Sequence, residues 1–175
     1  MTRRIGDGGS MVAHGAKFEQ PFVRTRRHGS LLRGIVLGGI VAGTVDIGAA
    51  CLISGHPVGF ILQTIAGGLM GKASFAGGSP TAVLGLALQE VMGVLIAAAF
   101  SLAVRRAPFL ARRWIPGGLV YGVVIFVVMN YVVVPLSAWH VVPHFKPTSF
   151  SENMLAMLLF GLIVAFFARA AATTR

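Results

Sequence analysis

The sequence is poor in charge for its length. Asp, Glu, Lys and Arg supply 11% of its 175 residues, whereas hydrophobic residues supply 55% and the mean hydropathy is +0.81. In a soluble domain about a quarter of the residues are charged, and they cover its surface. The shortage therefore excludes an ordinary soluble domain and predicts a protein embedded in a membrane.

Acidic residues are scarcer still. Five Asp and Glu stand against 15 Lys and Arg, which gives a net charge of +10. An excess of this sign can indicate a nucleic-acid partner. Here the basic residues gather in short segments between long apolar runs, which is the pattern of a membrane protein with basic loops. We therefore expect no nucleic-acid partner.

The sequence also lacks the signatures of the common enzyme classes. It contains no GxSxG, HExxH, P-loop, dinucleotide-binding or CxxC motif. We therefore predict no catalytic residue and no cofactor, and an enzyme is the least favoured class. An enzyme acting on lipid or on a substrate outside the membrane would depend on the loop histidines His56, His140 and His144.

A single cysteine, Cys51, excludes an internal disulfide bond. Together with the loop histidines it supplies ligand types that bind transition metals. Pro143 lies between His140 and His144, which argues against a helix that presents both on one face. We expect no metal site.

Four apolar runs are long enough to cross a bilayer, whose hydrocarbon core of about 30 Å needs about 20 helical residues. They cover about residues 31–54, 81–104, 115–137 and 153–172. A fifth run, about residues 57–72, is too short to cross and is expected to lie at the interface or to dip in and return. The predicted fold class is an all-α integral membrane protein with four transmembrane helices and an extra short helix between spans one and two.

The basic residues predict the orientation. Seven Lys and Arg precede residue 34, and four more lie in the loop RRAPFLARR. The positive-inside rule places both groups in the cytoplasm, so an even number of crossings separates them. We therefore expect that the short fifth run does not cross and that both termini lie in the cytoplasm.

Residues 1–30 form a predicted disordered basic arm ahead of a transmembrane domain at residues 31–172. The arm contains no apolar run, so no secretory signal peptide is expected. Two interpretations of its basic residues stay open: they set the topology, or they also bind anionic lipid headgroups at roughly 1 kcal/mol per residue. The candidates for headgroup binding are Arg24, Arg26, Arg27 and Arg33.

Every predicted span carries small residues four positions apart. The pairs are Gly34 and Gly38, Gly39 and Gly43, Gly118 and Gly122, and Gly161 and Ala165, and the second span has the four-spaced row Gly85, Gln89, Gly93, Ala97 and Ser101. Within lipid, hydrophobic burial does not drive helices together, and small residues let their backbones approach instead. The spacing predicts a compact bundle.

Polar residues within the spans form the candidate site. Asp46 shares a helical face with Gly39 and Gly43, so it is expected to point at neighbouring helices. A charge at bilayer depth costs about 3 kcal/mol or more, so such a residue usually has a partner or a function. The candidates at similar depth are Asp46, Gln89, Glu90, Asn130 and Tyr131.

Three interpretations of these polar residues stay open. In the first, they form a polar clasp that holds the helices together. In the second, they form a proton or cation relay, or a polar pocket. In the third, they bind a cationic residue of a partner protein. We favour the clasp, because no Lys or Arg lies at this depth to pair with Asp46 and Glu90. We therefore expect the two carboxyl groups to hydrogen-bond with each other, with Asn130 or with Thr44.

The segments TVDI, ILQTIAGGLMGKASFAGG and MNYVVVPLSA occur in this order along the chain. In this respect the sequence resembles small bacterial inner-membrane proteins of unknown function, and its layout is more distantly similar to the YagU type. The resemblance covers residues 31 to about 169. It implies a four-span protein of the bacterial inner membrane and carries over no catalytic residue.

Two functions from different classes are compatible with these features. The favoured one is an accessory protein or subunit of a membrane complex, because the loops are short and little mass lies outside the membrane. The alternative is a small oligomeric transporter or proton- or cation-conducting protein, with Asp46, Glu90 and Asn130 lining a polar path. The expected partners are membrane lipids and either another membrane protein or further copies of the chain.

Overall fold

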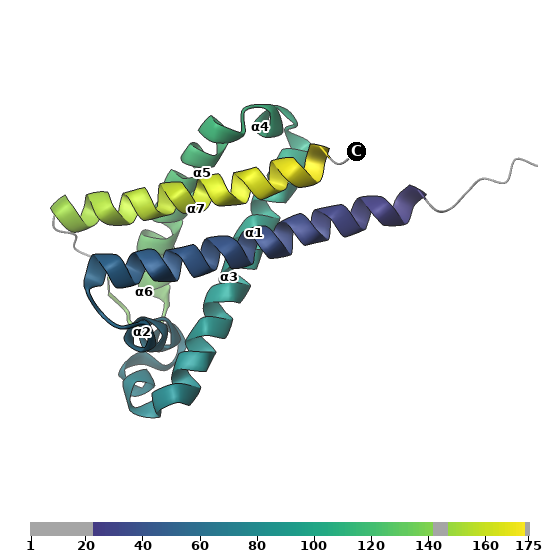
Figure 1. Cartoon of the computed structure of the whole chain (residues 1–175). Coiled ribbons are helices and arrows are strands. Elements are labelled where there is room, and N and C mark those ends of the chain that lie inside the picture. The colour runs from purple at the N-terminus through teal and green to yellow at the C-terminus, as the bar shows by residue number, and fades with distance from the viewer. Residues whose placement is uncertain (1–22, 142–146, 174–175) are drawn as a thin grey trace, which may run out of the picture.

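The computed structural model of the chain (Figure 1) describes residues 23–141 and 147–173, with side chains for residues 30–141 and 147–172. These residues form helices and short connections. Four helices are long and apolar enough to cross a membrane, and a shorter helix precedes the second of them. The fold class predicted from the sequence is confirmed.

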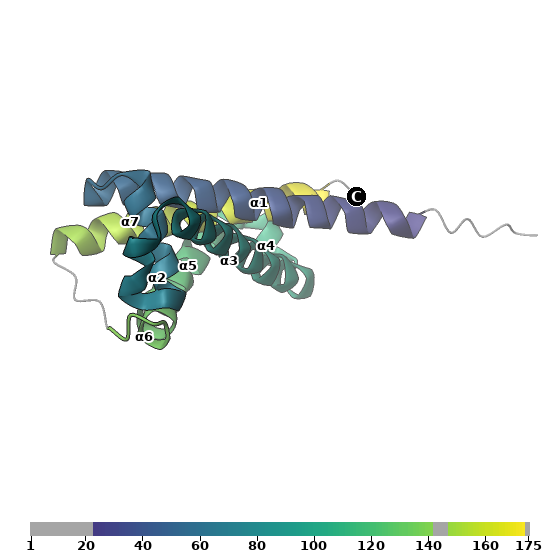
Figure 2. The same cartoon turned by 90° about the horizontal axis from the view of Figure 1, so that it is seen from below.

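The four long helices form two crossing layers. Helices α1 (Val23–Ser54) and α7 (Pro147–Thr173) lie side by side and run in opposite directions (Figure 1). Helix α3 (Gly78–Arg106) packs on α1, and α5 (Trp114–Val128) packs on α7. Seen from below, α1 and α7 make one layer, and α3 and α5 lie beneath it (Figure 2).

The short helix α4 (Phe109–Arg112) joins α3 to α5 at one end of the molecule (Figure 1). The C-terminal part of α7 lies at this end too, because the Arg169 guanidinium sits 5.6 Å from the centre of the Trp114 ring. So does the first part of α1, where a Cβ on Gly34 would lie 2.7 Å from that of Ala171. We call this the basic end, because the described residues Arg33, Arg105, Arg106, Arg112, Arg113 and Arg169 gather there.

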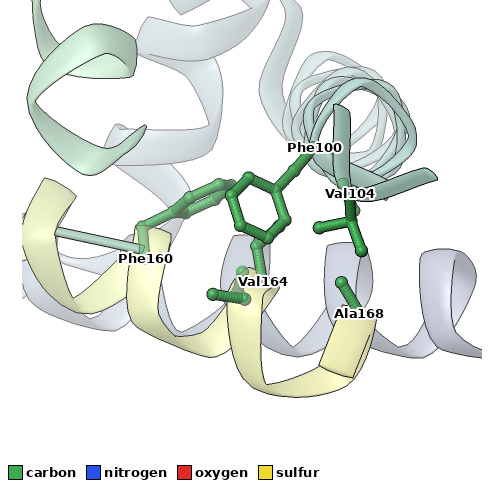
Figure 3. Close-up of a cluster of buried hydrophobic side chains, with 8 residues drawn as sticks. Phe100, Val104, Phe160, Val164 and Ala168 are labelled. Atoms are coloured by element: carbon green, nitrogen blue, oxygen red, sulfur yellow. The ribbon is translucent and has the colours of Figure 1, made fainter. Parts of the chain in front are cut away.

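Apolar side chains fill the space between the two layers. Phe100 and Val104 from α3 meet Phe160, Val164 and Ala168 from α7 (Figure 3), and each of the five is at most 7% exposed. Many other large apolar side chains lie on the outer surface. This distribution suits helices that are surrounded by lipid, because lipid makes exposed apolar side chains favourable.

The predicted small-residue faces are the places where the helices approach most closely. A Cβ on Gly93 of α3 would lie 2.6 Å from the carbonyl oxygen of Gly39 on α1. A Cβ on Gly122 of α5 would lie 2.5 Å from the carbonyl oxygen of Met157 on α7. Side chains at these positions would separate the backbones, so the compact packing depends on glycine.

The third span departs from a regular α-helix near its end. After α5 comes the π-helical segment η2 (Met129–Val133), followed by α6 (Val134–Leu136). Pro135 has no backbone N–H, and its ring crowds the carbonyl group four residues earlier, at Tyr131. A π-helical turn widens the helix at that point and relieves the conflict. The expected span is present, with a distorted final third.

The extra helix α2 (Val58–Met70) lies away from the basic end, between the start of α3 and the segment after α6 (Figure 1). It continues into the 3-10 segment η1 (Gly71–Gly77). The backbone N–H of Ala138 donates to the Gly68 carbonyl at 2.8 Å, and the Trp139 indole N–H donates to the Thr64 carbonyl at 3.2 Å. These bonds and the packing on α3 hold α2 in place.

Several helices extend beyond their expected limits. Helix α1 begins at Val23 rather than near residue 31, and α7 begins at Pro147 rather than near residue 153. Helical backbone satisfies its own hydrogen bonds, so a span can continue past the hydrocarbon core. The rest of the predicted arm, residues 1–22, lies outside the described residues, as do the side chains of Arg24, Arg26 and Arg27.

Candidate functional site

The crossing of α1 and α3 joins four polar side chains. The Gln89 amide donates a hydrogen bond to the Asp46 carboxyl group at 2.9 Å, and this bond is partly buried. The Thr44 hydroxyl donates to Glu90 Oε1 at 3.3 Å, and this bond is exposed. We call Thr44, Asp46, Gln89 and Glu90 the polar crossing.

The glycines of α1 place these groups. Asp46 lies on the same face as Gly39, whose backbone touches α3, so its carboxyl group meets Gln89 as the face predicts. Glu90 lies against Gly43, where a Cβ would be 3.5 Å from its Oε2 atom. The Glu90 carboxyl group therefore lies next to α1 at Gly43.

Glu90 has too few hydrogen-bond donors. Its Oε2 atom is buried and has no hydrogen-bond partner among the described residues, and its Oε1 atom receives only the Thr44 hydroxyl. Leaving a buried polar atom unpaired costs about 1–3 kcal/mol, and more when the group is charged. Residues 23–141 and 147–173 therefore provide no hydrogen-bond donor for this atom.

One face of α1 beside the polar crossing is uncovered. Thr44, Gly48 and Leu52 are four residues apart and share this face, and Leu52 is 87% exposed. A Cβ on Gly48 would meet no atom within 4 Å. We call these three residues the open face.

Asn130 and Tyr131 lie in η2, which follows α5. The Asn130 amide donates to the Phe126 carbonyl of its own helix at 2.9 Å, and Tyr131 is 52% exposed. No hydrogen bond among the described residues joins either side chain to the polar crossing. The structure brings together three of the five candidates, Asp46, Gln89 and Glu90.

Tyr121 makes the polar link between α5 and α3, and sequence analysis did not single it out. Its hydroxyl group donates to the Ile96 carbonyl at 2.7 Å, and its ring lies 4.8 Å from that of Phe100. The available signal was a hydroxyl group inside an apolar span, since a buried tyrosine usually finds a hydrogen-bond partner.

Replacing Tyr121 with phenylalanine removes only the hydroxyl group and keeps the ring contact. We expect the free energy of unfolding to fall by about 0.6 kcal/mol, the average for hydrogen bonds between membrane helices. Unfolding in mixed micelles measures the change. A loss above 2 kcal/mol would mean that the hydroxyl group has a further partner.

The remaining candidates are less closely assembled. Arg33 is exposed on α1 at the basic end. Within the described residues, no three His, Cys, Asp or Glu side chains lie close enough to hold a metal ion, and His144 lies outside them.

No protein-family model, curated protein or solved structure matches the chain.

Proposed function

We propose that the chain is a non-enzymatic subunit of a protein complex in a bacterial inner membrane, with the basic end in the cytoplasm. The open face of α1 receives a transmembrane helix of a different protein. The observation that carries the proposal is the Glu90 carboxyl group. Its buried Oε2 atom has no hydrogen-bond partner among the described residues, and its Oε1 atom bonds to Thr44 of the open face.

Small side chains suit the open face to helix docking. Thr44 and Gly48 are four residues apart, a spacing that lets two helix backbones approach closely in lipid. No atom of the described residues lies within 4 Å of a Cβ placed on Gly48, and Leu52 projects beside it. A second helix can therefore lie along α1 without displacing described residues.

The carboxyl group of Glu90 indicates the chemistry of the partner. The Thr44–Glu90 hydrogen bond is exposed, so a side chain that arrives over the open face can reach this group. Intramembrane carboxyl groups pair with cations or with other polar groups. The partner helix therefore carries a Lys or Arg at the depth of Glu90.

Site-specific crosslinking tests the proposal. A photo-crosslinking residue at Gly48 should label a transmembrane segment of another protein that contains Lys or Arg. The same residue at Val120, which is 66% exposed on α5, is the matched control and should label lipid. In variants Glu90→Leu and Gly48→Leu, co-purification of the labelled protein should fall at least tenfold. Labelling of lipid alone, or of a second copy, would overturn the proposal.

The alternative is a small oligomeric protein that conducts protons or cations. The polar crossing supports this alternative because Glu90 could bind a proton or a cation where the docking proposal places a partner's side chain. Liposomes that contain only this chain should then show a flux that Asp46→Asn or Glu90→Gln abolishes. The docking proposal expects no flux in either the original chain or the variants.

A further inference from the structure

The basic end carries positive charge that the acidic side chains of the described residues do not balance. Among the described residues the acidic side chains are Asp46, Glu90 and Glu152. The first two belong to the polar crossing, and Glu152 lies near the start of α7, away from the basic end. Arg33, Arg105, Arg106, Arg112 and Arg113 therefore form no ion pair with an acidic side chain of the described residues.

Helix α4 has one face packed on the protein and one face turned away. Leu110 and Trp114 pack against the buried core cluster. In contrast, Phe109 is 64% exposed, and Arg112 and Arg113 are also exposed. Ile115, one residue after Trp114, is 50% exposed. The exposed side chains between Phe109 and Ile115 thus include two guanidinium groups and two large apolar groups.

A similar combination occurs on α1 at the same end. An open hollow of about 450 Å³ is lined by Leu32, Arg33, Val36 and Leu37. Three of these residues are apolar, and the fourth carries a positive charge. An acyl chain fits such an apolar surface, with its headgroup beside the arginine.

We propose that the basic end selectively binds acidic phospholipid. The headgroup phosphate contacts Arg112 and Arg113, and the acyl chains lie against Phe109 and Ile115. A second lipid molecule occupies the hollow beside Arg33. This proposal does not depend on the proposed docking function, because it concerns the other end of the molecule and different residues.

The apolar side chains identify the occupant as a lipid. Arginines alone would also suit a nucleic acid or an acidic protein, since each of these carries dense negative charge. The exposed side chains of Phe109 and Ile115 make favourable contacts with the hydrocarbon of acyl chains, which a nucleic acid does not offer. Basic residues next to transmembrane helices are attracted to the acidic lipids of the facing leaflet.

Tryptophan quenching tests the proposal on the full chain, since Trp114 and Trp139 are its only tryptophans. Trp114 begins α5 at the basic end, whereas Trp139 bonds to Thr64 of α2, which lies away from that end. In a Trp139→Phe background, Trp114 reports on lipids at the basic end. Brominated phosphatidylglycerol should bind about tenfold more tightly there than brominated phosphatidylcholine. In a Trp114→Phe background, quenching of Trp139 should show a preference for phosphatidylglycerol below about twofold. The reason is that Lys72 is the one Lys or Arg among the described residues at that end.

Charge variants complete the test. Arg112→Gln with Arg113→Gln should reduce the preference at Trp114 to about twofold or less, whereas Arg112→Lys with Arg113→Lys should keep most of it. The preference should also weaken as salt is raised, because salt screens exposed charges. Equal binding of the two lipids at Trp114, or a preference unchanged in the glutamine variant with an unaltered unfolding midpoint, would overturn the proposal.

Discussion

Replacement of Gly93 with leucine is expected to lower the free energy of unfolding by about 3 kcal/mol and to separate α1 from α3. A Cβ at this position would lie 2.6 Å from the carbonyl oxygen of Gly39. The neighbour is backbone, so it cannot move aside as a flexible side chain does. Overpacking costs about 1–3 kcal/mol, and the two hydrogen bonds of the polar crossing add about 0.6 kcal/mol each when the helices part.

Unfolding in mixed micelles, followed by circular dichroism, measures this loss. Gly48→Leu is the matched control, because a Cβ at Gly48 meets no atom within 4 Å. The control should change the free energy of unfolding by less than about 0.5 kcal/mol. If Gly93→Leu were equally harmless, α1 and α3 would not be in backbone contact.

The Gly48→Leu control also separates stability from docking. Under the proposed function it leaves the fold intact and blocks the partner helix, whereas Gly93→Leu disrupts the chain itself. A variant that folds normally and no longer captures its partner would therefore assign the loss to the open face. This comparison is possible because α1 has one glycine in tight contact with α3, Gly39, and one glycine with no neighbour, Gly48.

The fold was predictable because its causes are local in the sequence. Hydrophobic length alone predicts a membrane span, and small residues at four-residue spacing predict which faces pack. The exact limits of the helices were not predictable, because residues 23–30 and 147–152 are polar enough to suggest loops and yet continue the helices. The π-helical segment before Pro135 was not predictable either, because it depends on how the backbone relieves the clash of the proline ring.

The site was only partly predictable, for a different reason. Helical periodicity correctly placed Asp46 on the face of Gly39, so its contact with another span followed. The depth of a residue along its span does not reveal which other spans lie beside it. Asn130 was predicted at a similar depth, but its amide donates to the Phe126 carbonyl of its own helix. The lack of a donor for Glu90 Oε2 depends on side-chain positions that no sequence pattern specifies.

The bond between Asp46 and Gln89 gives the second large expected effect. Gln89→Leu should lower the free energy of unfolding by about 2 kcal/mol, because the partly buried Asp46 carboxyl group loses its amide donor. Asp46→Leu should cost less, about 1 kcal/mol, since the freed glutamine amide can turn to a backbone carbonyl of its own helix. The double variant should cost clearly less than the sum, because two apolar side chains then meet and neither polar group is left unpaired.

A double-mutant cycle isolates the coupling between the two side chains. We expect a coupling energy of about 1–2 kcal/mol for Asp46 with Gln89. The matched cycle pairs Asp46→Leu with Asn130→Leu, which alters a residue outside the polar crossing, and should give a coupling below about 0.5 kcal/mol. Additive losses for Asp46 and Gln89 would refute the clasp. If the double variant is stable and still captures its partner, Asp46 serves the fold of the chain, and docking depends on Glu90 and the open face.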